Sequence, residues 1–316
     1  MADKKIIAVL GATGAQGGGL VRAITEDRNG GFSARAITRD PQSQKARELA
    51  ALGAEVVAAD IDDEQSLAKA LAGAWGAYFV TFYWDHFSPE KEMAEARNMA
   101  AAAKAAGIRH AIWSTLEDTR KWVPLTDNRM PTLMGQYKVP HFDAKGASNE
   151  VFTAAGVPTT FLLTSFYWDN LIHFGMGPKK DADGKLAIAF PMDDKKLPGI
   201  AAEDIGRCAY GIFKQSERWI GKTVGIAGEH PTGTQMAAEL SRALGREVRY
   251  NAVTPDAYRA FGFPGADDLG NMFQFKRDFE SYFTGARDPA VARSLYPGLQ
   301  TFATWVGRNK DRIPVD

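Results

Sequence analysis

The stretch of sequence with the clearest bearing on chemistry is "QYKVPHFDAKGASNEVF", residues 136 to 152. Within it, His141 and Lys145 are four residues apart, which places both side chains on one face of a helix. An imidazole can exchange a proton near neutral pH, but a nearby ammonium group disfavours the charged imidazolium form. His141 beside Lys145 would therefore lack the proton that a general acid must give. A carboxylate partner for His141 would change this expectation, and Asp143 is too near in sequence to judge.

A second chemical feature is the glycine-rich segment "GATGAQGGGLVRAI", which follows the apolar run "KIIAVLG". Gly11 permits a tight turn, Gly14 allows the backbone to approach a pyrophosphate, and Gly17 allows the following helix to pack closely. The amino end of that helix offers unpaired N–H donors and a partial positive charge to phosphate groups. Because a predicted strand precedes the glycines and a helical pattern follows them, the segment predicts a dinucleotide-binding turn.

The end of the second predicted strand, "AITRDP", indicates which dinucleotide is bound. An acidic residue at this point would accept hydrogen bonds from the adenosine ribose 2′-hydroxyl, whereas the guanidinium of Arg39 matches a 2′-phosphate in charge and shape. Arg39 therefore favours NADP(H) over NAD(H), although Asp40 could serve the ribose instead. After the third strand, Asp60 and Ile61 are placed to border the adenine. Asp60 could equally cap the next helix.

Short apolar runs alternate with helical patterns through the first half of the chain, which is typical of a parallel sheet covered on both faces. We expect an α/β fold with a Rossmann-type, doubly wound parallel sheet in residues 1–164. Its six predicted strands are residues 5–11, 33–38, 54–59, 77–82, 110–115 and 159–164. Several of the intervening helices end in Gly, the usual left-handed stop.

Beyond residue 164 the pattern changes to Gly/Pro-rich turns, short strands and short helices. Residues 165–316 are therefore predicted to form a smaller C-terminal α/β lobe for substrate or partner binding. Segments such as "KTVGIAG" could return to the main sheet. Between the fifth strand and the helix that carries Lys145, residues 116–140 are too long for an ordinary connection. They are either a mobile lid or a surface excursion packed on its own apolar side chains.

Bulk properties exclude several classes of protein. Thirty-eight basic residues balance thirty-eight acidic ones, so no overall field attracts nucleic acid or anionic lipid. The single cysteine, Cys208, excludes an internal disulfide and a Cys-based zinc site, and its apolar surroundings predict a buried, inert thiol. No metal site is predicted. "MADKK" leads directly into a strand, and no apolar run approaches membrane-spanning length, so we expect a cytoplasmic protein.

Taken together, the sequence resembles the NmrA-like family, an atypical branch of the short-chain dehydrogenase/reductases. The resemblance covers nearly the whole chain and rests on "GATGAQGG", "TRDP", "GAEVVAADIDD", "VTFYW", "HFDAKG", "GVPTTFLLTSFYWDN" and "YRAFGFPGADDLGNMFQF". The last two of these segments are most similar to the family members that resemble NADP(H) sensors. The family resemblance implies a Rossmann domain, NADP(H) in the cleft beside a small lobe, and either a redox-responsive regulatory role or reduction of quinones, dyes or phenolic compounds. A homodimer is implied by the resemblance alone.

The resemblance also implies a set of cofactor-binding residues. The pyrophosphate loop is matched by Gly11, Thr13, Gly14, Ala15, Gln16 and Gly17. The 2′-phosphate contact is matched by Arg39, and the adenine edge by Asp60 and Ile61. The loop after the fourth strand is matched by Thr81, Phe82 and Tyr83. Lys145 matches the ribose-binding lysine, and Tyr167, Trp168 and Asn170 border the nicotinamide. Ser43 and Ala94 replace basic residues that close relatives have near the 2′-phosphate, which weakens the expected preference for NADP(H).

In active members of the superfamily, a Tyr donates the proton during hydride delivery, and His141 replaces it here. If the chain is catalytic, the candidate residues are Lys145, His141, Ser114 and Tyr167, with Tyr83 and Tyr137 as further sources of a proton. The missing Tyr favours an NADP(H)-responsive regulator that acts through a protein partner, such as a transcription regulator. The alternative is an NADPH-dependent reductase of a planar activated electrophile, which can be reactive enough to take its proton from water.

Overall fold

The computed structural model describes residues 4–181 and 183–315. The first three residues of "MADKK", on which the expectation of a cytoplasmic protein partly rests, lie outside the described residues. Across the described ranges, no helix combines the length and the apolar character needed to span a membrane.

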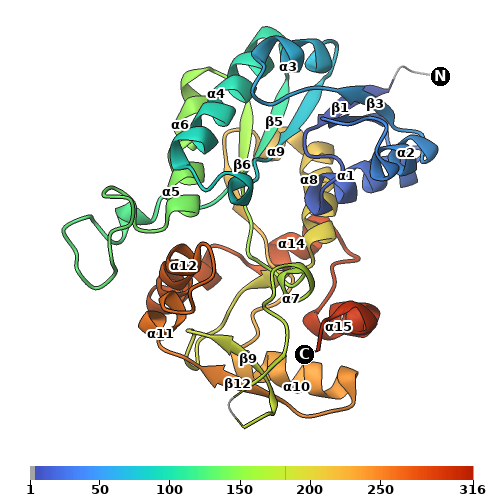
Figure 1. Ribbon diagram of the computed structural model, residues 1–316. Coiled ribbons are helices and arrows are strands. Elements are labelled where there is room, and N and C mark those ends of the chain that lie inside the picture. Colours follow the sequence, from blue (N-terminus) through green and yellow to red (C-terminus); the bar gives the residue numbers. More distant parts are fainter. Residues whose placement is uncertain (1–3, 182, 316) are drawn as a thin grey trace.

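The centre of the molecule is a seven-stranded parallel sheet with the order β11-β6-β5-β4-β1-β2-β3 (Figure 1). Its strands are β1 Lys5–Val9, β2 Phe32–Thr38, β3 Glu55–Ala58, β4 Gly76–Phe79, β5 His110–Thr115, β6 Thr159–Leu163 and β11 Thr223–Gly225. The predicted doubly wound fold class is therefore confirmed. The seventh strand comes from "KTVGIAG" and pairs with β6, so the chain returns to the main sheet after building part of the second lobe.

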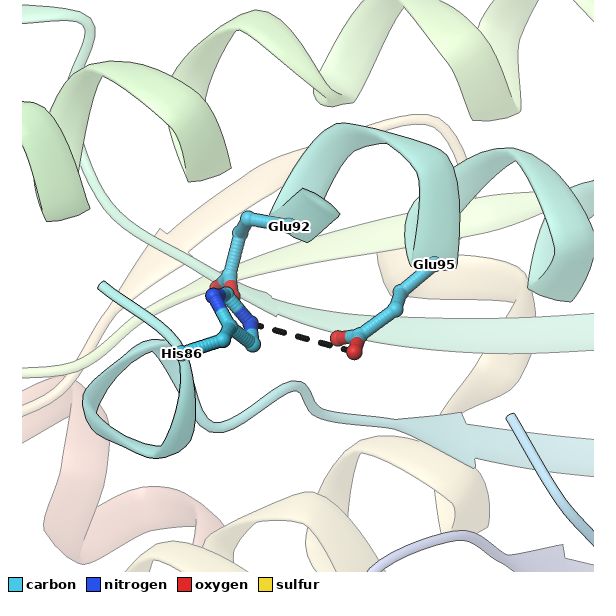
Figure 2. Close-up of side chains that lie close together, drawn as sticks. All are labelled: His86, Glu92 and Glu95. Carbon is cyan, nitrogen blue, oxygen red and sulfur yellow. Dashed lines mark ion pairs between the residues drawn. The ribbon is translucent and has the colours of Figure 1, made fainter. Parts of the chain in front are cut away.

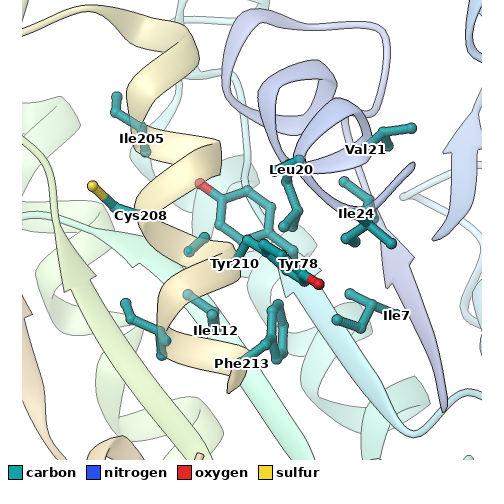
Figure 3. Packing of buried hydrophobic residues seen from close by; sticks show 14 of the residues in the cluster. Ile7, Leu20, Val21, Ile24, Tyr78, Ile112, Ile205, Cys208, Tyr210 and Phe213 are labelled. Carbon is teal, nitrogen blue, oxygen red and sulfur yellow. The ribbon is translucent and has the colours of Figure 1, made fainter. Parts of the chain in front are cut away.

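Helices cover both faces of this sheet. They are α1 Ala15–Glu26, α2 Gln44–Ala51, α3 Glu64–Leu71, α4 Pro89–Ala105, α5 Pro140–Ala147, α6 Asn149–Ala154, α8 Ala202–Lys214, α9 Ser216–Trp219 and α14 Pro289–Leu295. Because side chains alternate along a strand, Ile7 and Val9 of β1 pack in the core with α1 and α8 (Figure 3). Ala8 and Leu10 pack in the opposite core with α3, α4 and α6.

Helices α1 and α8 approach each other through glycines. A Cβ on Gly19 would lie 2.3 Å from the carbonyl oxygen of Glu203, and a Cβ on Gly206 would lie 2.2 Å from the backbone of Gln16 and Leu20. These backbone atoms cannot move aside as a flexible side chain would. The close helix pair holds the amino end of α1, and with it the glycine turn, against the sheet.

This contact predicts that Gly19→Ala will destabilise the protein by about 2 to 3 kcal/mol, the usual cost of overpacking. Urea unfolding with an unchanged m-value is the measurement. The matched control is Gly307→Ala in α15 (Phe302–Asn309), where an added Cβ has open space and should stabilise by about 0.5 to 1 kcal/mol. Equal stability of Gly19→Ala and the unmodified chain would contradict the tight helix contact.

The C-terminal lobe has its own core, centred on residues such as Trp168, Phe190, Phe273 and Trp305. Its small sheets have the orders β10-β7 and β12-β9-β8. The strands are β7 Phe166–Tyr167, β8 Lys179–Lys180, β9 Leu186–Phe190, β10 Gly199–Ile200 and β12 Val248–Ala252, and the helices are α7 Asn170–His173, α10 Gly233–Leu244, α11 Pro255–Arg259, α12 Ala266–Asp278, α13 Glu280–Gly285 and α15. Short 3₁₀ turns are η1 Tyr83–Asp85, η2 Thr119–Lys121 and η3 Lys310–Arg312.

The long connection 116–140 is anchored rather than loosely attached. Val123 and Met130 are buried in the C-terminal core. From α12, Asn271 donates to the carbonyl oxygens of Pro131 and Lys138 at 2.9 and 2.6 Å. These contacts favour the packed-excursion interpretation of the segment over a mobile lid. The predicted burial of Cys208 is also confirmed, and this burial raises the pKa of its thiol.

Candidate functional site

The glycine turn after β1 has the geometry that its sequence predicts. Gly11 adopts φ = +63°, in the left-handed region that favours glycine. A Cβ on Gly17 would lie 2.4 Å from the carbonyl oxygen of Gly11. Gly14 is the N-cap of α1 and brings no side chain to its free N–H groups, while Thr13 and Ala15 flank it. A glycine-lined cradle at an uncapped helix end fits a pyrophosphate.

The cradle lies at the switch point of the sheet, where β1 has β2 on one side and β4 on the other. In open α/β sheets, ligands bind at the carboxyl ends of the strands on either side of this point. The loops after β1 and β4 are therefore the two expected walls of the site, as the sequence predicts.

Gln16 connects the glycine turn to three other elements. Its side-chain nitrogen donates to the Tyr167 hydroxyl at 2.6 Å, and its oxygen accepts from Tyr78 at 2.5 Å and from Ser114 at 2.9 Å. Ser114, one of the candidate catalytic residues, thus donates its hydrogen bond to Gln16. Burial raises the pKa of Tyr167 to about 12, so this phenol holds its proton more tightly than an ordinary tyrosine.

The adenosine edge of the predicted site is open to solvent. The Arg39 side chain is 78% exposed and lies 3.7 Å from the exposed carboxylate of Asp85. Asp63, rather than Asp60, caps α3, so the alternative role for Asp60 as the helix cap was wrong. Asp60 instead accepts from a backbone N–H two residues later, and Ile61 follows it at the same edge.

Lys145 is held by buried acceptors beneath the loop after β4. Its ammonium nitrogen lies 2.6 Å from Glu92 Oε1, 2.5 Å from the Thr81 hydroxyl and 3.2 Å from the Thr81 carbonyl oxygen. Glu92 is fully buried on α4. The three hydrogens of the ammonium thus have three acceptors, and the charge of Lys145 is balanced by a carboxylate.

His141 has a carboxylate partner from the other lobe. Its Nδ1 lies 2.7 Å from Asp268 Oδ1, and its backbone N–H donates to Asp268 Oδ2 at 3.2 Å. Both side chains are buried. His141 therefore has the carboxylate partner that the sequence left open, and the ammonium of Lys145 is paired with Glu92.

Asp143, the sequence neighbour of His141, has a structural role instead. Its two oxygens accept from the backbone N–H groups of Thr119, Lys138 and Val139 and from the Thr119 hydroxyl, at 2.6 to 3.1 Å. These bonds hold both ends of segment 116–140 against α5. Asp143 is therefore fully used and does not serve His141.

Aromatic side chains surround the His141 side of the site. The ring of His141 lies 4.8 Å from that of Trp84 and 5.9 Å from that of Tyr83. Tyr83 is buried, whereas Phe82 beside it is 52% exposed and packs edge-on against the exposed Phe174. Burial raises the pKa of Tyr83, which argues against its use as a proton donor. Phe82 is thus the member of the predicted Thr81–Tyr83 loop with a ring available to a ligand.

Of the residues predicted to border the nicotinamide, Tyr167 lies in the site, whereas the side chain of Trp168 lies in the core. Tyr167 faces Gln16, but Trp168 is fully buried and packs on Phe302 in the C-terminal lobe. The Trp168 side chain therefore lies in the C-terminal core, and its place at the edge of the nicotinamide stays a prediction. The apolar pattern "SFYWDN" does not distinguish a tryptophan in a cleft from one in a core. Asn170 begins helix α7.

Two site residues were missed by reasoning from sequence. Glu92 lies in "PEKEMAEAR", which has the composition of a solvated helix, and Asp268 lies 127 positions from the histidine that it contacts. Neither has a local motif. A buried carboxylate beside a predicted functional lysine or histidine becomes recognisable only when the helices are placed in space.

Comparison with known proteins agrees with this geometry. The model of the NmrA-like family matches residues 3–306. The NmrA-like family domain-containing oxidoreductase FrzB of Cladobotryum sp. is 31% identical over 321 residues, covering 96% of this chain and 93% of that protein.

Solved structures give the same result. The negative transcriptional regulator NmrA in complex with NAD superposes with a TM-score of 0.78 at 25% identity, covering 96% of this chain and 95% of that one. The Citrobacter sp. triphenylmethane reductase complexed with NADP(H) has a TM-score of 0.74 at 20% identity over 96% of this chain and 99% of that one, which is a likeness of fold. The chain therefore belongs to the NmrA-like family, with its NAD(P)-binding Rossmann-type fold.

Proposed function

We propose that this protein is an NADP(H)-dependent reductase of a planar, activated electrophile, and that His141 supplies the proton. The observation that carries the proposal is the 2.7 Å contact between His141 Nδ1 and Asp268 Oδ1. A carboxylate on Nδ1 fixes the ring orientation and lies where it can balance the positive charge that a general-acid histidine carries. Nε2 is then the ring atom from which a proton can leave.

The dinucleotide would be held by the glycine cradle, by Arg39 at the 2′-phosphate and by Lys145 at a ribose. When bound, NADPH supplies a hydride to the substrate carbon. His141 gives a proton from Nε2 to the substrate heteroatom, Asp268 stabilises the charge of the ring before this transfer, and solvent returns the proton afterwards. The aromatic rings of Phe82 and Phe174 offer faces and edges on which a flat substrate can stack.

The test of this function is to follow NADPH absorbance with purified protein across a panel of quinones, cationic dyes and enones. Turnover that is lost in Lys145→Ala, while NADPH still binds by fluorescence, supports the reductase. Absence of turnover on every class, with NADPH bound, would overturn it.

The dinucleotide preference has its own prediction. We expect Arg39→Ala to weaken NADP⁺ binding roughly 10-fold, since one charge-assisted contact contributes about 1.5 kcal/mol or more. NAD⁺ has no 2′-phosphate, so its affinity should change less than twofold. Calorimetric titration of both dinucleotides measures this, with Arg28→Ala on the exposed segment between α1 and β2 as the matched control. Equal losses for NADP⁺ and NAD⁺ would contradict the assignment of Arg39.

A second candidate function is a redox-responsive regulator that acts on a protein partner such as a transcription regulator. The hydrogen bond from Gln16 to Tyr167 favours it, because it links the phosphate turn to the first strand of the C-terminal lobe. Occupancy of the turn could thereby change the partner-binding surface of that lobe. A redox sensor must bind NADPH and NADP⁺ with different affinities, and a tenfold difference corresponds to about 1.4 kcal/mol. Equal affinities would exclude redox sensing.

A further inference from the structure

A buried cluster of titratable groups lies directly behind Lys145. His86 Nε2 is 3.5 Å from Glu92 Oε2 and 3.8 Å from Glu95 Oε1 (Figure 2). Glu92 is fully buried and Glu95 is 5% exposed. Among the described residues, His86 Nε2 and Glu92 Oε2 are buried polar atoms without a hydrogen-bond partner. Unpartnered buried polar atoms cost free energy and therefore need an explanation.

The cluster has the residue types of a metal site, but its hydrogen bonding argues against one. His86 Nδ1 accepts the backbone N–H of Ser88 at 3.0 Å, so in the neutral ring the proton is on Nε2. A metal ligand needs its lone pair on the atom that faces the ion, and its other nitrogen normally donates. The Nε2–H group of His86 is instead a donor that lies between the carboxylates of Glu92 and Glu95. This arrangement is suited to a proton shared among the three groups.

Lys145 connects this cluster to the proposed cofactor site. Its three ammonium hydrogens are already used by Glu92 and by two oxygens of Thr81. To bind a ribose hydroxyl, Lys145 must give up at least one of these contacts. Turning away from Glu92 would leave a buried carboxylate without its counter-ion, which is strongly unfavourable unless a proton replaces the lost charge.

We propose that His86, Glu92 and Glu95 form a proton-binding site that takes up a proton when a dinucleotide draws Lys145 toward its ribose. Cofactor binding would then be proton-linked. The inference rests on the dinucleotide-binding part of the proposed function and is independent of whether a substrate is turned over.

The surroundings of Glu95 are suited to this role. Burial and the neighbouring Glu92 raise the pKa of Glu95 to about 7. The other groups that face it are Lys91 on its own helix, Asp62 from the turn before α3, His86 from the turn before α4 and Lys145 from α5. Asp85 adds a further negative charge beside His86. A weaker Lys145–Glu92 contact would favour protonation, because it removes a positive charge from beside the two carboxylates.

The experiment is calorimetric titration of the intact protein with NADP⁺ at pH 7.5, in HEPES and in Tris. The dependence of the binding enthalpy on the ionisation enthalpy of the buffer gives the number of protons exchanged. We expect an uptake of roughly 0.5 to 0.75 proton, because a group with a pKa of about 7 is already partly protonated at this pH. The 2′-phosphate is already ionised at this pH, since such a group titrates near about 6, and NAD⁺ should give the same uptake.

Glu95→Gln should reduce the uptake to near zero, with folding checked by thermal unfolding. The matched control, Glu150→Gln, changes an exposed glutamate on α6 and should leave the uptake unchanged. Binding without any dependence on buffer in the unmodified chain would overturn the inference, even if Glu95→Gln did not fold. So would stoichiometric binding of Zn²⁺ that is lost in Glu95→Gln, because that result would assign the cluster to a metal. Proton uptake on cofactor binding, without turnover of any substrate, would support this inference and contradict the reductase function.

Discussion

Asp268→Asn is expected to lower kcat for NADPH-dependent reduction about 100-fold or more, the usual contribution of a positioned general acid, while the Kd for NADPH changes less than twofold. The physical reason is that an amide can still hydrogen-bond to His141 but cannot balance an imidazolium. Single-turnover oxidation of NADPH, compared with NADPH binding by fluorescence, separates the two effects.

The matched control is Asp267→Asn, which removes an exposed carboxylate from the adjacent position of the same helix. It should leave kcat unchanged. His141→Asn should match the loss caused by Asp268→Asn, and the double variant should be no worse, because the two residues act as one unit. Full activity in His141→Asn would show that the proton comes from water or from another residue, and it would contradict the role of His141 as the proton donor.

Lys276→Met is expected to stabilise the protein by about 1 to 4 kcal/mol at pH 7, the range found when buried ion pairs are replaced by well-packed apolar side chains. Lys276 is 3% exposed on α12, and its ammonium lies 5.4 to 5.8 Å from the centres of four phenylalanine rings. Its nitrogen contacts the sulfur of Met272 at 3.3 Å. Burial, together with the nearby Arg287, lowers the pKa of Lys276 to about 7. Methionine has a similar length and carries no charge to desolvate.

The stabilisation by Lys276→Met should depend on pH, because the folded and unfolded chains bind different numbers of protons at Lys276. In the unfolded chain the lysine titrates near 10.5, so between pH 7 and about 10.5 the unfolded state binds more protons than the folded state. The contribution of Lys276 to the free energy of unfolding therefore rises with pH in this window, by up to about 1.4 kcal/mol per pH unit. The advantage of Lys276→Met should be full at pH 7 and below, and should shrink as the pH rises toward 10.

Urea unfolding of both chains between pH 6.5 and 9.5 measures this dependence. The control is Lys222→Met, which replaces an exposed lysine before β11 and should change stability by less than about 0.5 kcal/mol at every pH. A Lys276→Met variant less stable than the unmodified chain would show that the surrounding rings stabilise the ammonium more than burial penalises it.

Much of the fold could be predicted from sequence because the relevant signals are local. The alternation of short apolar runs with helical patterns placed β1 to β6 within one to three residues of their observed ends. Gly11 and Gly17 were predictable for the same reason, since a left-handed turn and a close backbone contact both exclude a side chain. The position of Arg39 directly after β2 was predictable as well, since the strand ends at Thr38, whereas its contact with a 2′-phosphate stays a prediction.

The chemistry of the site depends on contacts that no local pattern contains. The charge states that surround His141 and Lys145 are set by Asp268 on α12 and by Glu92 on α4. On sequence alone, each of these carboxylates resembles an exposed helical residue. Conversely, Trp168 looked available to a cofactor and is buried in the C-terminal core.

The amino-acid sequence by itself therefore determined the parallel sheet, the phosphate-binding turn and the presence of His141 where a tyrosine would be expected. Only the tertiary structure decided whether that histidine has a carboxylate partner and whether the lysine is already neutralised. The reason is physical. Backbone turns and strand periodicity depend on a few adjacent residues, whereas the electrostatic state of a buried group depends on every charge that folding brings within a few ångströms of it.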